Sequence, residues 1–246
     1  MADQRQVSGN PTSVAAVVFD LFNTLTAPID DLVFRSSLKE MARAVGTGPV
    51  AFTQGWLDLW RQLFDGTLPT TEAGVRAVCD AIGVPVHAEA ISEAVKIRAE
   101  FLRGTLRPRV DAVATLTQLR ALGLRTALIS NCSPGVPVLR PTTPYADVMG
   151  LPLFSCVEGL LKPDPAIFLR ACQRLDVDPQ ACVYVGDGGD HELTSAESVG
   201  MRAVLITTPE ERTAAYDSER ASWRGEAIEA LSKLSGLTTG AEAAAD

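Results

Sequence analysis

The chain has 246 residues, of which 46% are hydrophobic and 21% charged, enough apolar material for one large domain or a domain with a smaller insert. No apolar stretch approaches the roughly 20 residues that a membrane-spanning helix needs, which argues against a membrane protein. The formal net charge is −8, and no run of Lys and Arg interleaved with aromatic residues is present, which argues against nucleic-acid binding.

The first predicted element is an apolar, β-branched strand that ends at Asp20 and continues into a turn, Leu21–Leu25. An open parallel sheet places its chemistry at such carboxyl ends of strands. Residues 1–12, before this strand, lack apolar periodicity and are predicted to be a disordered tail.

A long stretch without strand-like alternation follows, at about residues 28–105. Four amphipathic helices are predicted in it, at Asp30–Val45, Val50–Phe64, Thr71–Ile82 and Ala88–Leu102. A strand, an all-helical insert and a return to the sheet together indicate a cap domain over the end of the first strand.

From residue 110 onward, predicted helices and strands alternate. The helices are Val110–Leu122, Asp164–Leu175, His191–Val199 and one near Glu226–Leu234, and the strands are Arg125–Ile129, Leu153–Cys156, Cys182–Val185 and Arg202–Ile206. This rhythm predicts an α/β fold, with a doubly wound, Rossmann-like parallel sheet covered by helices on both faces. We expect this core to comprise residues 13–27 and 106–236, with residues 237–246 as a second disordered tail.

Three further segments place polar side chains at or just beyond strand ends. Ser130 and Asn131 follow one strand, and Lys162 stands immediately before the start of a helix. Another strand runs into residues 186–192, Gly-Asp-Gly-Gly-Asp-His-Glu, whose three carboxylates repel one another unless a cation lies among them. We interpret this loop as a metal site, and its spacing is too short for the twelve-residue ligand series of an EF-hand.

With Asp20, these segments resemble the haloacid dehalogenase-like hydrolase superfamily. The four motifs of that family are a DxDxT-type nucleophile strand, a strand ending in Ser or Thr, a Lys, and an acidic GDxxxD/E-type strand end. The resemblance covers about residues 14–207, and the stretches 159–168 and 185–193 match most specifically. It implies a Rossmann-like core, and the insert resembles the small α-helical cap found in members that act on small molecules.

The resemblance implies a catalytic set. Asp20 would be the nucleophile that forms a covalent aspartyl intermediate, which water then hydrolyses, and Thr24 would orient the nucleophile loop. Ser130 and Asn131 would hold the transferring phosphoryl group by hydrogen bonds, and Lys162 would supply a compact positive charge.

The resemblance also implies a Mg²⁺ site, which would reduce the repulsion between the nucleophile and a phosphate dianion. The expected ligands are Asp20, the main-chain carbonyl of Phe22, and Asp187. The family usually carries Asp or Asn four residues after the first acid of the fourth motif, where this chain has His191. We therefore expect Asp190 to act as the outer metal ligand.

Phe22 departs from the phosphatase pattern, because phosphatases of the family carry a second Asp there that protonates the leaving alcohol. Loss of a general acid typically reduces the rate by about 10²–10⁴-fold, and His191 is a candidate replacement. Members that split phosphonates or acyl phosphates also manage without this Asp. The dehalogenating branch shows an aromatic residue here and works without metal, but it carries Ser-x-Asn where this chain has Gly-Asp-Gly at 186–188.

Three hypotheses follow. The first is a Mg²⁺-dependent phosphatase that acts on a small phosphorylated metabolite through an aspartyl-phosphate at Asp20. The second is metal-independent hydrolysis of the carbon–halogen bond of a 2-haloacid. The third is a catalytically weak relative that only binds a ligand, with Phe22 marking the loss of turnover.

The predicted partner is a small anionic substrate, with neither nucleic acid nor membrane, and the predicted assembly is a monomer or a homodimer. In the insert, Arg35 and Arg61 are candidate substrate contacts, near Trp56 and Trp60. The five cysteines show neither a CxxC pair nor a metal-ligand spacing, so we interpret them as reduced thiols. A polar N-terminus without a secretory apolar core favours a cytoplasmic location.

Overall fold

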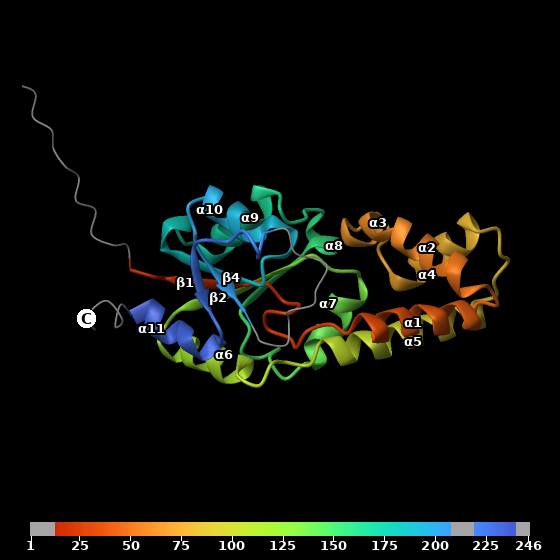
Figure 1. Ribbon diagram of the computed structural model, residues 1–246, viewed down its shortest axis with the longest axis horizontal. Helices are drawn as coiled ribbons and strands as arrows, with labels where there is room; N and C mark the ends of the chain where they lie inside the picture. The colour runs from red at the N-terminus through yellow and green to blue at the C-terminus, as the bar shows by residue number, and fades with distance from the viewer. Residues whose placement is uncertain (1–12, 208–218, 240–246) are drawn as a thin grey trace, which may run out of the picture.

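The computed structural model describes residues 13–207 and 219–239 (Figure 1). A six-stranded sheet whose paired strands are all parallel forms one half of the molecule. Its strand order is β3-β2-β1-β4-β5-β6, so the first strand lies in the interior of the sheet. The strands are β1 (Ala16–Phe19), β2 (Arg125–Ser130), β3 (Leu151–Phe154), β4 (Cys182–Gly186), β5 (Arg202–Ile206) and β6 (Glu226–Ile228).

Helices cover both faces of this sheet, which confirms the predicted doubly wound α/β fold (Figure 1). Val17 and Phe19 of β1 belong to a first apolar cluster on one face of the sheet, and Ala16 and Val18 belong to a second cluster on the other face, as the two-residue period of a strand requires. All four side chains are fully buried. The helices that flank the sheet are α6 (Ala112–Ala121) and α11 (Leu234–Thr239) on the first face, and α9 (Pro165–Leu175) and α10 (Glu192–Ser198) on the second.

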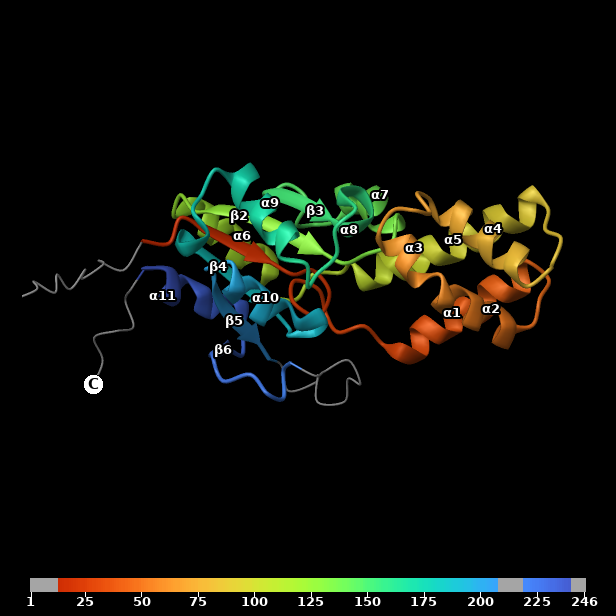
Figure 2. The same ribbon diagram turned by 90° about the horizontal axis from the view of Figure 1, so that it is seen from above.

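The register of the central strands brings distant parts of the sequence to one edge. Phe19 at the end of β1 is aligned with Leu128 of β2 and with Val185 of β4. The next residue, Asp20, donates its main-chain N–H to the Val185 carbonyl at 2.9 Å. The polar residues that follow these three strands therefore lie together, at the edge to which β1 points in Figure 2.

The segment between β1 and β2 is helical and has its own apolar core, which includes Leu38, Phe52 and Ile91. The chain leaves and re-enters the sheet region at Thr26 and Pro108, which form an isolated antiparallel bridge. We call this segment the helical insert. Its helices are α1 (Asp31–Ala44), α2 (Pro49–Asp58), α3 (Trp60–Phe64), α4 (Thr71–Ala81) and α5 (Ala88–Thr105).

Local sequence signals account for most of these helix boundaries. The Asp30 side chain accepts hydrogen bonds from the first main-chain N–H groups of α1, and the Thr70 hydroxyl does the same for α4. Asp164 caps α9 in the predicted way. The single helix predicted over residues 50–64 is instead two helices, α2 and α3, which meet at Leu59.

The secondary structure predicted for two segments is wrong. The third strand begins and ends two residues earlier than predicted, and residues 155–158 form a short helix, α8 (Ser155–Glu158). The helix predicted near Glu226–Leu234 begins as strand β6, because pairing with β5 along the sheet edge overrides local helical preference. Two ion-paired hydrogen bonds of 2.7 Å between Arg202 and Glu226 tie these strands together.

Helix α11 begins at Leu234 and extends into the stretch predicted as the second tail, where Leu237 packs against the first apolar cluster. The predicted tail residues 1–12 and 240–246 lie outside the described residues. The remaining short elements are α7 (Gly135–Leu139) and 3-10 turns at Arg140–Thr142, Pro179–Ala181, Gly189–His191 and Leu231–Lys233.

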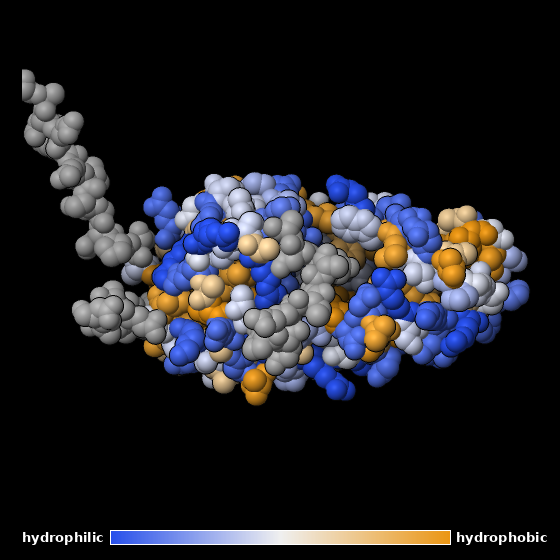
Figure 3. Space-filling model, viewed as in Figure 1, coloured by the Kyte–Doolittle hydropathy of each residue, from blue (hydrophilic) through white to orange (hydrophobic). Residues whose placement is uncertain are grey.

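The surface seen in Figure 3 is largely hydrophilic, with scattered apolar side chains. None of the helices in the described part of the chain combines the length and the apolar character needed to cross a bilayer. All five cysteines are free, in agreement with their interpretation as reduced thiols.

Candidate active site

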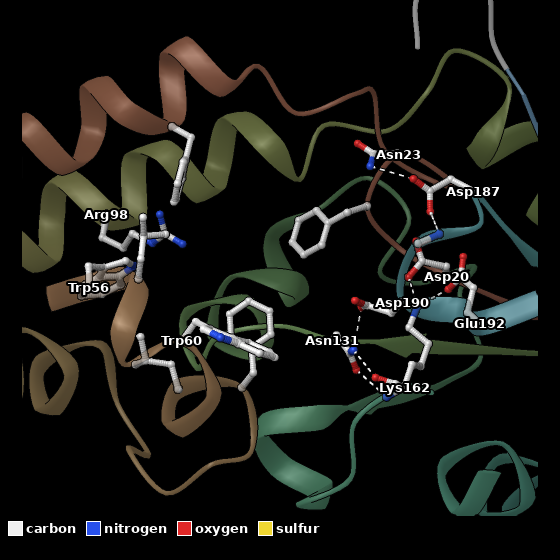
Figure 4. A pocket seen from close by; sticks show the side chains of 16 residues that line it. Asp20, Asn23, Trp56, Trp60, Arg98, Asn131, Lys162, Asp187, Asp190 and Glu192 are labelled. Carbon is white, nitrogen blue, oxygen red and sulfur yellow. Dashed lines mark hydrogen bonds and ion pairs between the residues drawn. The ribbon is translucent and has the colours of Figure 1, made fainter. Parts of the chain in front are cut away.

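A cavity of about 420 Å³ lies between the carboxyl edge of the sheet and the helical insert (Figure 4). Its size suits a small molecule. The sheet side is polar and acidic, whereas the insert side is mostly aromatic and aliphatic. The sheet side is lined by Asp20, Phe22, Asn23, Asn131, Lys162, Asp187, Gly189, Asp190 and Glu192, and the insert side by Phe34, Trp56, Leu57, Trp60, Leu63, Phe64 and Arg98.

Lys162 joins two buried carboxylates on the sheet side. Its ammonium lies 2.5 Å from Asp20 Oδ1, and it also forms an ion pair with Glu192. The Tyr184 hydroxyl donates to Glu192 Oε2 at 2.6 Å. All these residues are at most 6% exposed, so their charges interact with little screening by water.

Burial is the largest influence on the electrostatics of this cluster, followed by the attraction between Lys162 and the carboxylates. Burial raises the pKa of Asp20 to about 6, with Lys162 opposing this rise and Asp187 adding to it. Burial likewise raises the pKa of Glu192 well above its usual value, although Lys162 again opposes the rise. Burial disfavours the charged form of Lys162, but the neighbouring carboxylates outweigh this effect and raise its pKa. The cluster contains more carboxylates than its single ammonium group can neutralise.

Three acids of the cluster could hold a metal ion. One carboxylate oxygen from each of Asp20, Asp187 and Glu192 lies within 4.8 Å of the others. Oxygen ligands of this kind suit a hard divalent cation such as Mg²⁺, so the residues present fit the ion that the sequence predicts. The Asn23 side chain fixes Asp187 by donating to its Oδ2 at 2.9 Å.

The group of acids that could hold a metal ion includes Glu192, which was not an expected ligand, and does not include Asp190, which was. Asp190 lines the cavity but is outside the three-acid group, and its Oδ2 accepts a hydrogen bond from Asn131 Nδ2 at 2.8 Å. Glu192 is one of the three carboxylates of the predicted acidic loop, but no individual role was predicted for it. The sequence signal for such a role was the position of Glu192 beside the apolar Leu193 at the start of a predicted helix, because an acid that faces the core needs a charged partner.

Asn131 holds the Lys162 segment against the end of β2. Its Oδ1 accepts from the Lys162 main-chain N–H at 2.8 Å, and its Nδ2 donates to the Lys162 carbonyl at 2.9 Å. These bonds position the ammonium of Lys162. The predicted contact between Asn131 and substrate stays a prediction.

Ser130 and Thr24 are both fully buried close to β1, outside the residues that line the cavity. Within the described part of the chain, neither hydroxyl oxygen has a hydrogen-bond partner. Buried hydroxyl groups are normally paired, so an unpaired hydroxyl at a strand end is available to a ligand or water after a small adjustment. His191, the candidate replacement acid, is exposed and does not line the cavity.

The two arginines expected to contact substrate lie away from the cavity. Arg35 forms an exposed ion pair of 2.7 Å with Asp31, and Arg61 is exposed on α3. Neither lines the cavity, whereas Trp56, Trp60 and Arg98 do. Arg98 was not predicted from the sequence, because an arginine on a charged amphipathic helix is usually solvated. Its burial depends on the rings of Phe34 on α1 and Trp56 on α2 that lie against it.

The sequence matches a known protein family. The family model of the haloacid dehalogenase-like hydrolase matches residues 14–200. A bovine (Bos taurus) haloacid dehalogenase-like hydrolase domain-containing protein 3 is 31% identical, over 64% of this chain and 57% of the relative. The chain thus spans little more than half the length of that relative. A glyceraldehyde 3-phosphate phosphatase of Pyrococcus abyssi is 27% identical, over 78% of this chain and 80% of the phosphatase.

Solved structures share the fold over nearly the whole chain. The 2-haloacid dehalogenase from Pseudomonas syringae is 26% identical and superimposes with a TM-score of 0.67. The match covers 92% of this chain and 99% of the dehalogenase.

Proposed function

Because this chain belongs to the haloacid dehalogenase-like hydrolase family, we propose that it is a Mg²⁺-dependent phosphatase of a small phosphorylated metabolite. The observation that carries the proposal is the group of buried Asp20 and Glu192 and half-buried Asp187, with Lys162 in contact with the two buried acids. A phosphate dianion approaches a carboxylate only where positive charge compensates both, and this group offers one ammonium and a place for a cation. The phosphatase relative named above supports the same substrate class.

In the proposed reaction, a carboxylate oxygen of Asp20 attacks phosphorus, and the bond from phosphorus to the leaving oxygen breaks. A water molecule then attacks the phosphorus of the aspartyl-phosphate, which releases phosphate and regenerates Asp20. Lys162 stabilises the negative charge on the transferring oxygens, and the Ser130 hydroxyl, which has no hydrogen-bond partner among the described residues, donates to them after a small adjustment. Mg²⁺, held by Asp20, Asp187 and Glu192, would neutralise charge on the nucleophile and the phosphate. We propose that the helical insert acts as a cap that limits water in the cavity.

Among the described residues that line the cavity, Phe22 takes the position of the family's second Asp, so the family's usual proton donor for the leaving group is missing. We expect the enzyme to hydrolyse 4-nitrophenyl phosphate, with a weakly basic leaving group, far faster than an alkyl phosphate. The variant Phe22→Asp is expected to raise kcat for the alkyl ester by about 10²-fold or more, with a smaller gain for the aryl ester. Initial rates of phosphate release measure both. Equal gains for the two esters would show that the Phe22→Asp variant does not gain activity by protonating the leaving group.

Metal binding is expected to stabilise the protein in a pH-dependent way. Saturating MgCl₂ at pH 7.5 should raise Tm by about 5 °C or more relative to NaCl of equal ionic strength. Because the pKa of Asp20 is raised to about 6, its proton competes with Mg²⁺ below that pH. The stabilisation should therefore be nearly complete at pH 7.5 and shrink as the pH falls through 6 to 5.5.

The variant Glu192→Gln is expected to reduce the Mg²⁺-induced rise in Tm, whereas Glu89→Gln, at an exposed position of α5, should leave it unchanged. Thermal unfolding followed by circular dichroism measures these shifts. A rise in Tm that is the same in both variants would exclude Glu192 as a ligand.

A 2-haloacid dehalogenase is the second candidate, favoured by Phe22 and by the likeness to the Pseudomonas syringae enzyme. Phosphate release from a panel of phosphate esters, with Mg²⁺ or with a chelator, and halide release from 2-chloropropionate separate the two. We expect phosphate release that stops with chelator and no halide release. Halide release that persists with chelator would instead establish dehalogenation, and the lack of both would favour a ligand-binding relative.

A further inference from the structure

Arg98 of α5 is a buried cation in the wall of the cavity opposite the nucleophile. It is 6% exposed, and Figure 4 shows its guanidinium directed toward the cavity. The guanidinium carbon lies 4.8 Å from the ring centroid of Phe101, 5.4 Å from that of Trp56 and 5.5 Å from that of Phe34. Three aromatic rings from three helices therefore hold the charge in a fixed position.

The charge of Arg98 has no acidic partner among the described residues. Its Nε and Nη1 atoms are buried without a hydrogen-bond partner, and burial lowers its pKa to about 10 with no carboxylate opposing this effect. Other arginines of the insert behave differently: Arg76 pairs with Glu72 at 3.0 Å, and Arg103 pairs with Glu100 at 3.0 Å. Aromatic rings offset only part of the free-energy cost of a buried charge, so the site is completed by an anion.

The side chains around Arg98 define what kind of anion fits. The rest of the insert wall is apolar and includes Trp60, Leu63 and Phe64, and Arg98 is the one basic residue among the described residues that line that wall. One guanidinium neutralises a single negative charge, whereas a phosphate dianion would keep an excess charge against aromatic rings. A carboxylate carries one charge and two oxygens that match the guanidinium fork.

We propose that Arg98 determines specificity by binding a carboxylate of the substrate, on an apolar body whose other end carries the phosphate at Asp20. The inference rests on the proposed function and narrows it to phosphate esters of apolar or aromatic carboxylic acids. Arg98 acts in binding and takes no part in bond cleavage.

A pair of non-hydrolysable probes tests this inference: benzylphosphonate and 4-carboxybenzylphosphonate, which differ only in the carboxylate. Isothermal titration of the wild-type protein in MgCl₂ is expected to show about 10- to 100-fold tighter binding of the carboxylated probe. Arg98→Met should remove this preference, and Arg98→Lys, which keeps the charge but not the fork, should retain part of it. Arg103→Met, on the exposed face of the same helix, is the matched control and should keep the full preference.

Equal affinity of the wild-type protein for the two probes would overturn the inference, as would a full preference in Arg98→Met. If Arg98→Met does not fold, a full preference in Arg98→Lys would count against the guanidinium contact. Turnover of phenyl phosphate and 4-carboxyphenyl phosphate separates this inference from the proposed function. Binding preference without phosphate release would contradict the phosphatase proposal alone, and phosphate release without binding preference would contradict the role of Arg98 alone.

Discussion

Replacing Asp20 with Asn is expected to lower kcat for phosphate release by about 10⁴-fold or more, because a carboxamide cannot form the aspartyl-phosphate. The fold should survive this change. The pKa of Asp20 is raised to about 6 by burial, above its ordinary value of 3.8, so ionised Asp20 opposes folding above pH 6. At pH 7.5 without metal, Tm of the Asp20→Asn variant should therefore equal or exceed that of the wild-type protein.

The control for this variant is Asp80→Asn, an acid-to-amide change at an exposed position of α4, which should leave kcat unchanged. Acid quenching during turnover, followed by peptide mass spectrometry, should find a phosphoryl group on the peptide that contains Asp20. A variant Asp20→Asn that keeps several per cent of the wild-type kcat would exclude the covalent route. Loss of activity together with a large fall in Tm would instead show that Asp20 is needed for folding.

The sequence predicted the sheet and the polar residues at its edge because both depend on local signals. Asp20 and Asp187 each follow a short apolar strand, and Lys162 precedes a helix start marked by Asp164 and Pro165. In a parallel sheet such strand ends must meet at one edge, whatever the details of packing. This is why three residues from distant parts of the chain could be assigned to one cavity before their distances were known.

Glu192 and Arg98 could not be assigned in this way, because their positions depend on loop conformation and on helix packing. Asp190 and His191 both adopt positive φ, at 54° and 52°, and this turn brings Glu192 to face Lys162 at the start of α10. Asp and His are enriched among the non-glycine residues that adopt positive φ, but residue type alone does not indicate that two in succession do so. Arg98 similarly becomes a cavity residue only once α1 and α2 enclose it.

Strand β6, the outermost strand on one side of the sheet, is another element that could not be predicted from local sequence. Residues 226–234 have a helical pattern, yet Ile228 and Leu231 are buried against the first apolar cluster by pairing with β5 and by a 3-10 turn. A local sequence window does not contain pairing partners that are more than twenty residues apart. It therefore cannot predict a strand that depends on these tertiary contacts.

The variant Lys162→Met is expected to lose both activity and stability, since it removes the cation that two buried carboxylates share. Without that charge, kcat should fall by about 10³-fold or more, as expected when a preorganised group that stabilises transition-state charge is lost. Breaking a buried ion pair by removing one partner typically destabilises a protein by about 3–5 kcal/mol, because the remaining charges are uncompensated. Urea unfolding at pH 7.5 without metal measures this loss.

Conditions that neutralise the carboxylates should restore stability to the Lys162→Met variant without restoring activity. Lowering the pH to 5.5 protonates Asp20 and Glu192, whose pKa values are already raised by burial, so the deficit in unfolding free energy should shrink. Lys39→Met, at an exposed position of α1, should match the wild-type protein in both measurements. If the deficit at pH 5.5 equals that at pH 7.5, lost packing of the lysine stem, and not uncompensated carboxylate charge, is the cause.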